Sequence, residues 1–154
     1  MEALFELLGQ SGPAQWLRFS RWGYAAANTA HVASIAVLVG AILPLDLRLL
    51  GAWRSVPLAP LARVLVPVAA TGLACAATTG LLLFATRATE YAALDLLWLK
   101  LALVTAGTVH AVAIQAGPGL QALSAGGQRL TGSFSLTCLA GALVCGRFLA
   151  FVGD

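Results

Sequence analysis

Residues 22–43 read WGYAAANTAHVASIAVLVGAIL, an apolar run in which His31 is the one side chain that titrates near neutral pH. A helix needs about 20 mostly apolar residues to cross the roughly 30 Å hydrocarbon core of a bilayer. Three later stretches have the same character, over residues 65–86, 96–116 and 134–151. The sequence therefore predicts four membrane-spanning helices.

The composition leads to the same class of fold. Of the 154 residues, 60% are hydrophobic and 10% are charged, whereas a soluble domain carries about 25% charged residues. A soluble fold of this size could not bury so much apolar surface, because small domains have a high ratio of surface to volume. Barrel strands need only about 9–11 residues of alternating polarity. We therefore predict an all-α integral membrane four-helix bundle, with residues 1–154 forming one transmembrane domain.

The residues before the first predicted helix suit the membrane surface. Within residues 1–21, Trp16 and Arg18 are of the types that favour the headgroup layer, so we expect an interfacial segment. Glu2 and Glu6 make the start of the chain acidic, whereas a signal peptide begins with positive charge. We expect the first membrane helix itself to direct insertion.

The loops give an orientation and a set of partners. The loop over residues 46–63 contains Arg48, Arg54 and Arg63, and short basic loops stay in the cytoplasm. We therefore place it inside and both termini outside an inner (cytoplasmic) membrane. The loop over residues 117–133 is Gly-rich and expected to be long.

The charge of the chain bears on its partners. A formal charge of +3 without a basic run makes nucleic acid an unexpected partner. The expected partners are the lipid bilayer and other membrane protein subunits.

Small residues recur at a spacing that suits helix packing in lipid. Gly72, Ala76 and Gly80 occupy every fourth position of the second segment, and Gly141 and Cys145 do the same in the fourth. Helices in a bilayer associate through close packing rather than through the hydrophobic effect. We expect these stripes to let neighbouring backbones approach each other.

Charged residues at the predicted helix ends suit the headgroup region. Asp46 and Arg48 follow Pro44 and are predicted to form an interfacial ion pair. Lys100, near the start of the third segment, and Arg147, near the end of the fourth, are predicted to extend to the membrane surface along their aliphatic stems.

The two histidines raise the question of a cofactor, because both lie in predicted membrane helices, where an ionisable group is costly. Neutral imidazole binds heme iron, and helix bundles form cofactor sites from facing helices. His31 and His110 are therefore candidate axial ligands of a heme b, and Arg147 is a candidate partner for a propionate. A hydrogen bond between helices and a proton relay are the other open interpretations.

The depths of the two histidines argue against joint ligation. His31 lies 9 residues after Trp22, and His110 lies 14 residues after Leu96. If both helices enter from the same face, the two levels differ by roughly 8 Å at 1.5 Å per residue. Two axial ligands of one heme need nearly the same level.

Catalytic motifs are missing from the sequence. It contains no GxSxG, HExxH or phosphate-binding glycine loop, and no paired membrane carboxylates suited to ion transport. We therefore expect no enzyme activity. The leading hypothesis is a small accessory or structural subunit of a bacterial membrane complex. The alternative is a b-type heme protein that transfers electrons.

The stretch over residues 31–51, HVASIAVLVGAILPLDLRLLG, resembles a family of small bacterial four-helix membrane proteins of unknown function. Its marks are a His, a later Gly and a DLRLLG-like end. Further similarity lies in GLLLF at residues 80–84, in Tyr91, in Lys100 and in the Gly-Arg pair at residues 146–147. The first helix is more distantly similar to copper-resistance D-like proteins and membrane b-type cytochromes. This chain offers two histidines where a di-heme pattern needs four.

Overall fold

The computed structural model describes residues 2–117 and 119–152, and every regular element in this part of the chain is helical. The elements are α1 (Glu2–Gly9), α2 (Gly12–Phe19), α3 (Arg21–Leu50), α4 (Leu58–Thr86), α5 (Ala88–Ala92), α6 (Asp95–Ala116), the 3₁₀ turn η1 (Leu120–Ala122) and α7 (Ala125–Val152). Helices α3, α4, α6 and α7 are long and apolar enough to cross a membrane. The all-helical prediction with four candidate spans is confirmed.

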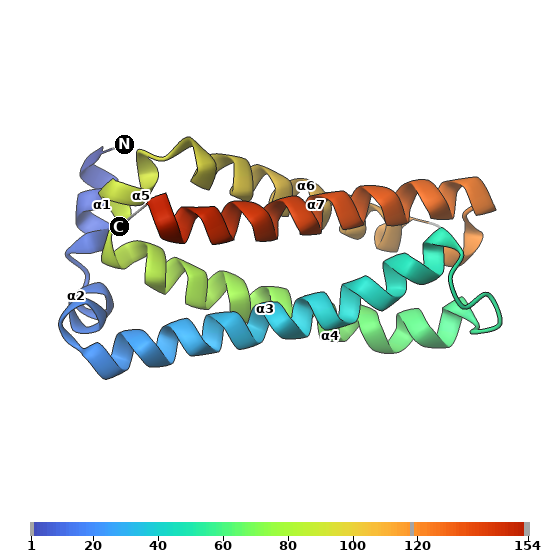
Figure 1. Ribbon diagram of the computed structural model, residues 1–154, viewed down its shortest axis with the longest axis horizontal. Helices are drawn as coiled ribbons and strands as arrows, with labels where there is room; N and C mark the ends of the chain where they lie inside the picture. Colours follow the sequence, from blue (N-terminus) through green and yellow to red (C-terminus); the bar gives the residue numbers. More distant parts are fainter. Residues whose placement is uncertain (1, 118, 153–154) are drawn as a thin grey trace.

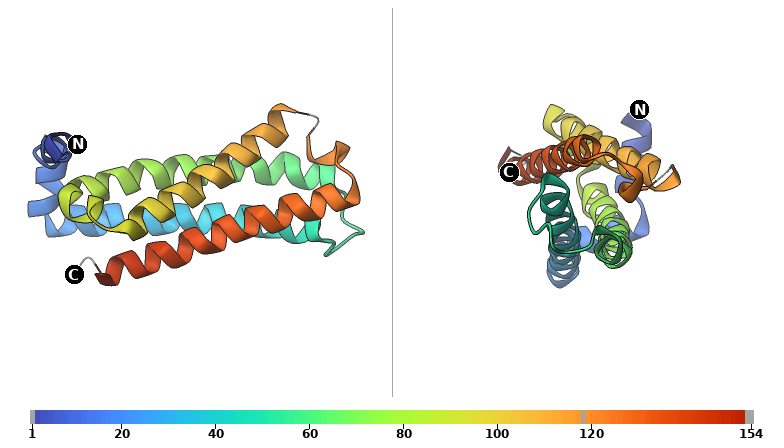
Figure 2. Two further views of the ribbon diagram at one scale, coloured as in Figure 1. Left: turned by 90° about the horizontal axis from the view of Figure 1, so that it is seen from above. Right: turned by 90° about the vertical axis from the view of Figure 1, so that its right-hand side faces the viewer.

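The four long helices form two hairpins that share one contact surface. Helix α3 packs along α4, α6 packs along α7, and α3 packs on α7 to join the two hairpins (Figure 1). Helices α4 and α6 make at most marginal contact, so the bundle is not closed on that side. Figure 2 shows this arrangement end-on and from above, and the view from above places α1 and the last turn of α7 at the same end of the bundle.

Three helix ends differ clearly from the predicted ones: α4 begins at Leu58 rather than at residue 65, and the ends of α3 and α7 differ because of caps. Helix α3 continues through Pro44 to Leu50 and ends at Gly51, whose φ of 108° suits a glycine C-cap. Helix α7 begins at Ala125, well before the expected start at Phe134, because the Ser124 hydroxyl accepts a hydrogen bond from the third residue of the helix. The expected loop over residues 117–133 is therefore shorter. Pro118, expected to end the third helix, lies outside the described residues.

The N-terminal segment forms two short helices across one end of the bundle. Helix α1 packs on α4 and α5, and the Phe5 ring meets the Phe84 ring edge to face, with centroids 5.9 Å apart. Helix α2 buries Leu17 against the bundle. By contrast, Phe19 and Trp22 are 85% and 84% exposed and point away from the protein. An exposed aromatic rim at a bundle end is typical of the headgroup layer.

Glycines set the closest helix contacts, as the small-residue stripes predict. A Cβ added at Gly72 of α4 would lie 2.8 Å from the backbone nitrogen of Leu38 in α3. One added at Gly141 of α7 would lie 2.9 Å from Cδ1 of Leu103 in α6. Each hairpin therefore depends on a position without a side chain.

Candidate functional site

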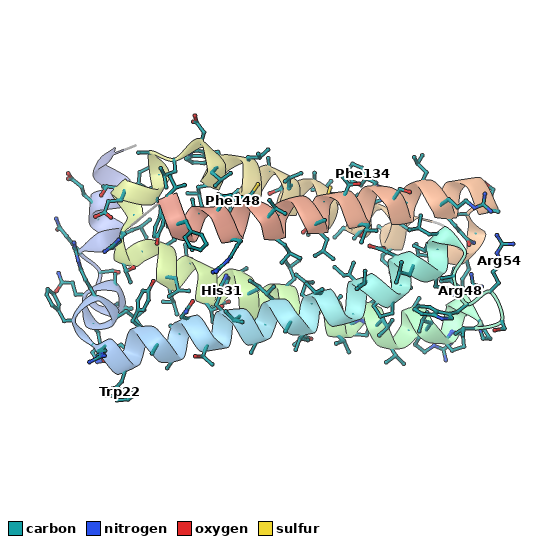
Figure 3. All side chains as sticks on the ribbon, in the orientation of Figure 1. Trp22, His31, Arg48, Arg54, Phe134 and Phe148 are labelled. Atoms are coloured by element: carbon teal, nitrogen blue, oxygen red, sulfur yellow. The ribbon has the colours of Figure 1, made fainter. Side chains whose placement is uncertain are left out.

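Side chains from all four long helices lie near one level of the bundle. They are His31 of α3, Thr79 of α4, Lys100 of α6 and Cys145 of α7, and we call this group the polar centre. His31 points from α3 into the bundle (Figure 3). Polar groups within membrane-spanning helices are costly and mark functional positions. The polar centre is therefore the first candidate site.

The hydrogen bonds of Thr79 fix the form of the His31 ring. The Thr79 hydroxyl donates its one hydrogen to the Cys75 carbonyl at 2.7 Å. The Ala76 carbonyl, at 3.3 Å, is a second and longer acceptor for the same hydrogen. With its hydrogen on these carbonyls, the hydroxyl accepts from Nδ1 of His31 at 3.0 Å. Nδ1 then carries the hydrogen of the neutral ring, and Nε2 keeps its lone pair. The ring is thereby oriented on α4 while one nitrogen stays available as an acceptor.

A glycine makes room for this ring. A Cβ at Gly80 would lie 2.9 Å from Cε1 of His31, closer than side-chain atoms approach one another. Gly80 and Thr79 are consecutive residues of α4. One provides space for the imidazole, and the other provides its hydrogen-bond partner.

Lys100 brings a positive charge to the polar centre. Its Nζ lies against Gly146 of α7, where an added Cβ would be 3.4 Å away. The ammonium is in electrostatic range of the His31 ring and of the Cys145 thiol. In the part of the chain that the structure describes, no carboxylate forms an ion pair with it. Its aliphatic stem runs along α7 in the space above Gly146, and the predicted extension to the membrane surface stays a prediction.

A second polar group lies near the other end of the bundle. Asp46 is only 3% exposed, and its carboxyl interacts with the Ser135 side chain of α7. Its Oδ2 atom has no hydrogen-bond partner among the described residues. A buried polar atom without a partner costs about 1–3 kcal/mol, more when it is charged.

The predicted ion pair between Asp46 and Arg48 is wrong. Arg48 instead donates to the backbone carbonyls of Val56 at 2.7 Å and Arg54 at 3.3 Å. Residues two positions apart on a helix point to different sides. Asp46 therefore turns toward Ser135 of α7. Arg48 ties down the loop after α3, at the end of the bundle where Arg54 lies (Figure 3).

His110 belongs to the second polar group, away from the polar centre. Its ring lies on Phe134 of α7 with centroids 4.8 Å apart, and its buried Nε2 has no hydrogen-bond partner among the described residues. Phe134 is adjacent to Ser135, so His110 and Asp46 reach α7 at the same level. The interval from Lys100 to His110 on α6 corresponds to a rise of about 15 Å. The two histidines therefore occupy different levels.

Arg147 joins neither histidine. It is exposed, and its guanidinium lies 4.5 Å from the centroid of the Phe151 ring. The two histidines thus lie at two separate places, and Arg147 follows Gly146 of α7 next to the polar centre, with its guanidinium over Phe151. This arrangement does not fit one heme held by both histidines.

Three positions were not recognised as functional from the sequence. Thr79 was not singled out, and Lys100 and Asp46 were assigned to the membrane surface. For Lys100 the available signal was Gly146, which leaves the space for its side chain, as Gly80 does for His31. The helix pairing decides which side chain fills such a space, and the spacing of glycines in the sequence does not reveal that pairing.

Comparisons of this chain with protein-family models, with curated proteins and with solved structures found no match. The fold therefore defines the class: an all-helical protein with four helices long and apolar enough to cross a membrane. Within that class, its own features are the polar centre and the second polar group.

Proposed function

We propose that this chain is a small accessory or structural subunit of a bacterial membrane protein complex, without catalytic activity of its own. It spans the inner membrane four times, with the loop after α3 in the cytoplasm and both termini outside. Its partners are the lipid bilayer and other membrane subunits. The proposal rests on a polar group that faces outward from the bundle.

That group is the side-chain amide of Asn28. It is exposed on α3 and makes no hydrogen bond within the part of the chain that the structure describes. Asn28 lies two turns after Arg21, about 10 Å along the helix from the exposed residues at its start. Leaving such an amide unpaired in an apolar medium costs about 1–3 kcal/mol by mutational data. A helix of a partner subunit that hydrogen bonds to this amide would remove that cost.

The neighbouring Thr29 provides a matched control. It is also exposed, but its hydroxyl donates to the Ala25 carbonyl at 2.8 Å and so needs no partner outside the helix. We expect Asn28→Leu to release the chain from a larger assembly, and Thr29→Val to leave the assembly intact. Native gel electrophoresis of membranes solubilised in mild detergent measures both outcomes.

Cross-linking locates the contact. A photo-reactive residue at position 28 should give a discrete adduct with a membrane protein, whereas one at Val109, an exposed apolar position of α6, should react with lipid. Migration of the wild-type chain as a monomer, with adducts to lipid alone from position 28, would overturn the proposal.

Heme binding by His31 alone is the second candidate function. Ligating histidines commonly donate their other ring hydrogen to a fixed acceptor, and Thr79 is such an acceptor for Nδ1. Nε2 would then be the iron ligand. We expect a Soret band from protein produced in heme-replete cells, lost in His31→Ala and kept in His110→Ala. A colourless wild-type protein would exclude this candidate.

A further inference from the structure

The unclosed side of the bundle carries a groove between α4 and the end of α6. Its volume is about 270 Å³. Arg63 of α4, Gln115 of α6 and Gln121 of η1 line it together with the apolar residues Ala62, Val66 and Pro67. The groove lies where the backbones of α4 and α6 stay apart.

The polar side chains of the groove are available to a ligand. Arg63, Gln115 and Gln121 are exposed, and none of them forms a hydrogen bond or ion pair within the described chain. The groove therefore presents one cation and two amides to whatever occupies it.

The position of the groove indicates its occupant. Arg63 lies in the second turn of α4, and Gln115 is the last residue but one of α6. Both are thus near the end of the bundle that holds the α3–α4 loop, while Val66 and Pro67 lie deeper. From the end of the bundle inward, polar side chains thus come first and apolar ones follow. A phospholipid in a bilayer has the same order, with its headgroup at the surface and its acyl chain below. We propose that the groove binds an anionic phospholipid.

The chemistry of Arg63 favours a phosphate. A guanidinium can donate two parallel hydrogen bonds to phosphate oxygens, which an ammonium does not do with the same geometry. The two amides add donors, and the side of the groove that α4 and α6 leave open admits the acyl chain. In the orientation under Proposed function, this end faces the cytoplasmic leaflet, whose surface is negative. The proposed lipid site depends on the groove and not on the proposed role of the chain as an accessory subunit.

Native mass spectrometry of the full chain tests the site. The protein is released from nanodiscs containing equal amounts of phosphatidylglycerol and phosphatidylcholine, and the retained lipids are counted. We expect one retained phosphatidylglycerol, preferred by about tenfold, which is about 1.4 kcal/mol. Arg63→Gln should abolish the preference, and Gln115→Leu should weaken it. Arg129→Gln should keep it, since Arg129 is exposed on α7 but does not line the groove.

Three results would overturn the site. The first is equal retention of the two lipids by the wild type. The second is an equal loss in Arg63→Gln and Arg129→Gln, which would indicate general surface charge. The third is full displacement of the lipid by soluble glycerol phosphate, which would indicate a phosphate site without a role for the acyl chain. The far-UV circular dichroism spectrum of each variant, measured as a control, shows whether the variant keeps its helical fold.

Discussion

Gly132 of α7 packs directly on the backbone of α3 at Asp46. A Cβ added at Gly132 would lie 3.0 Å from the Asp46 carbonyl oxygen and 3.0 Å from Cβ of Leu49. Neither atom can move without moving α3. This contact holds the two helical hairpins together, because α3 and α7 form the surface that joins them.

We therefore expect Gly132→Ala to destabilise the protein by about 1–3 kcal/mol through overpacking. Gly40→Ala is the control, since a Cβ there meets nothing within 4 Å. It should be neutral or stabilise α3 by up to about 1 kcal/mol, because glycine is unfavourable in a helix interior. Thermal unfolding in detergent, followed by circular dichroism, compares the two variants. Equal melting temperatures would show that α3 and α7 do not meet at Gly132.

The ring of His31 should exist as the Nδ1–H tautomer, because the Thr79 hydroxyl is committed to the Cys75 carbonyl. Nitrogen NMR of the histidine-labelled protein distinguishes the two tautomers. Thr79→Val removes the acceptor, and Gly80→Ala displaces the ring. Both variants should move the His31 signals and leave those of His110 in place. A wild-type Nε2–H tautomer would contradict the assigned hydrogen bond.

Asp46→Asn should not weaken the bundle. The amide has nearly the same shape, keeps an oxygen for Ser135 and replaces an ionisable carboxyl, whose Oδ2 has no partner, with a group that stays neutral. We expect unchanged stability or a gain of up to about 1 kcal/mol, because an unpaired buried group costs more when it is charged. Asp46→Leu, which also removes the interaction with Ser135, should be less stable than Asp46→Asn. A lower melting temperature in Asp46→Asn than in the wild type would mean that the carboxyl itself is held in place.

The exposed aromatic residues around α2 should report the depth of this end of the bundle. Trp16 and Trp22 are both more than half exposed, and tryptophan favours the headgroup level. In liposomes we expect their fluorescence to be quenched more by lipids brominated near the headgroup than by lipids brominated near the chain end. Variants with Phe at the other tryptophans isolate the signal. Stronger quenching by the lipids brominated near the end of the acyl chain would place the segment within the hydrocarbon layer.

Much of the fold follows from local sequence. Four apolar runs of sufficient length predict the four long helices, and small residues every four positions predict the close contacts at Gly72 and Gly141. Helix ends were harder to predict, since they depend on single caps. Gly51 and Ser124 extend α3 and α7 beyond the apolar runs.

The sites were less predictable for a geometric reason. Spacing identified both histidines, but not that His31 meets Thr79 while His110 meets Phe134. Asp46 resembles a headgroup residue in sequence, because charged neighbours follow it. Its burial arises from the rotation of α3 against α7. Such rotations depend on how helices pair, and the pairing is not encoded in any one segment.

The ring contact between Phe5 and Phe84 has a consequence for biogenesis. At about 5–20 residues per second, Phe84 leaves the ribosome several seconds after Phe5. During that interval the first helix of the nascent chain has no intramolecular partner at α4. Docking of the N-terminal segment is therefore a late assembly step, and a chain arrested before residue 84 would leave this segment accessible to protease.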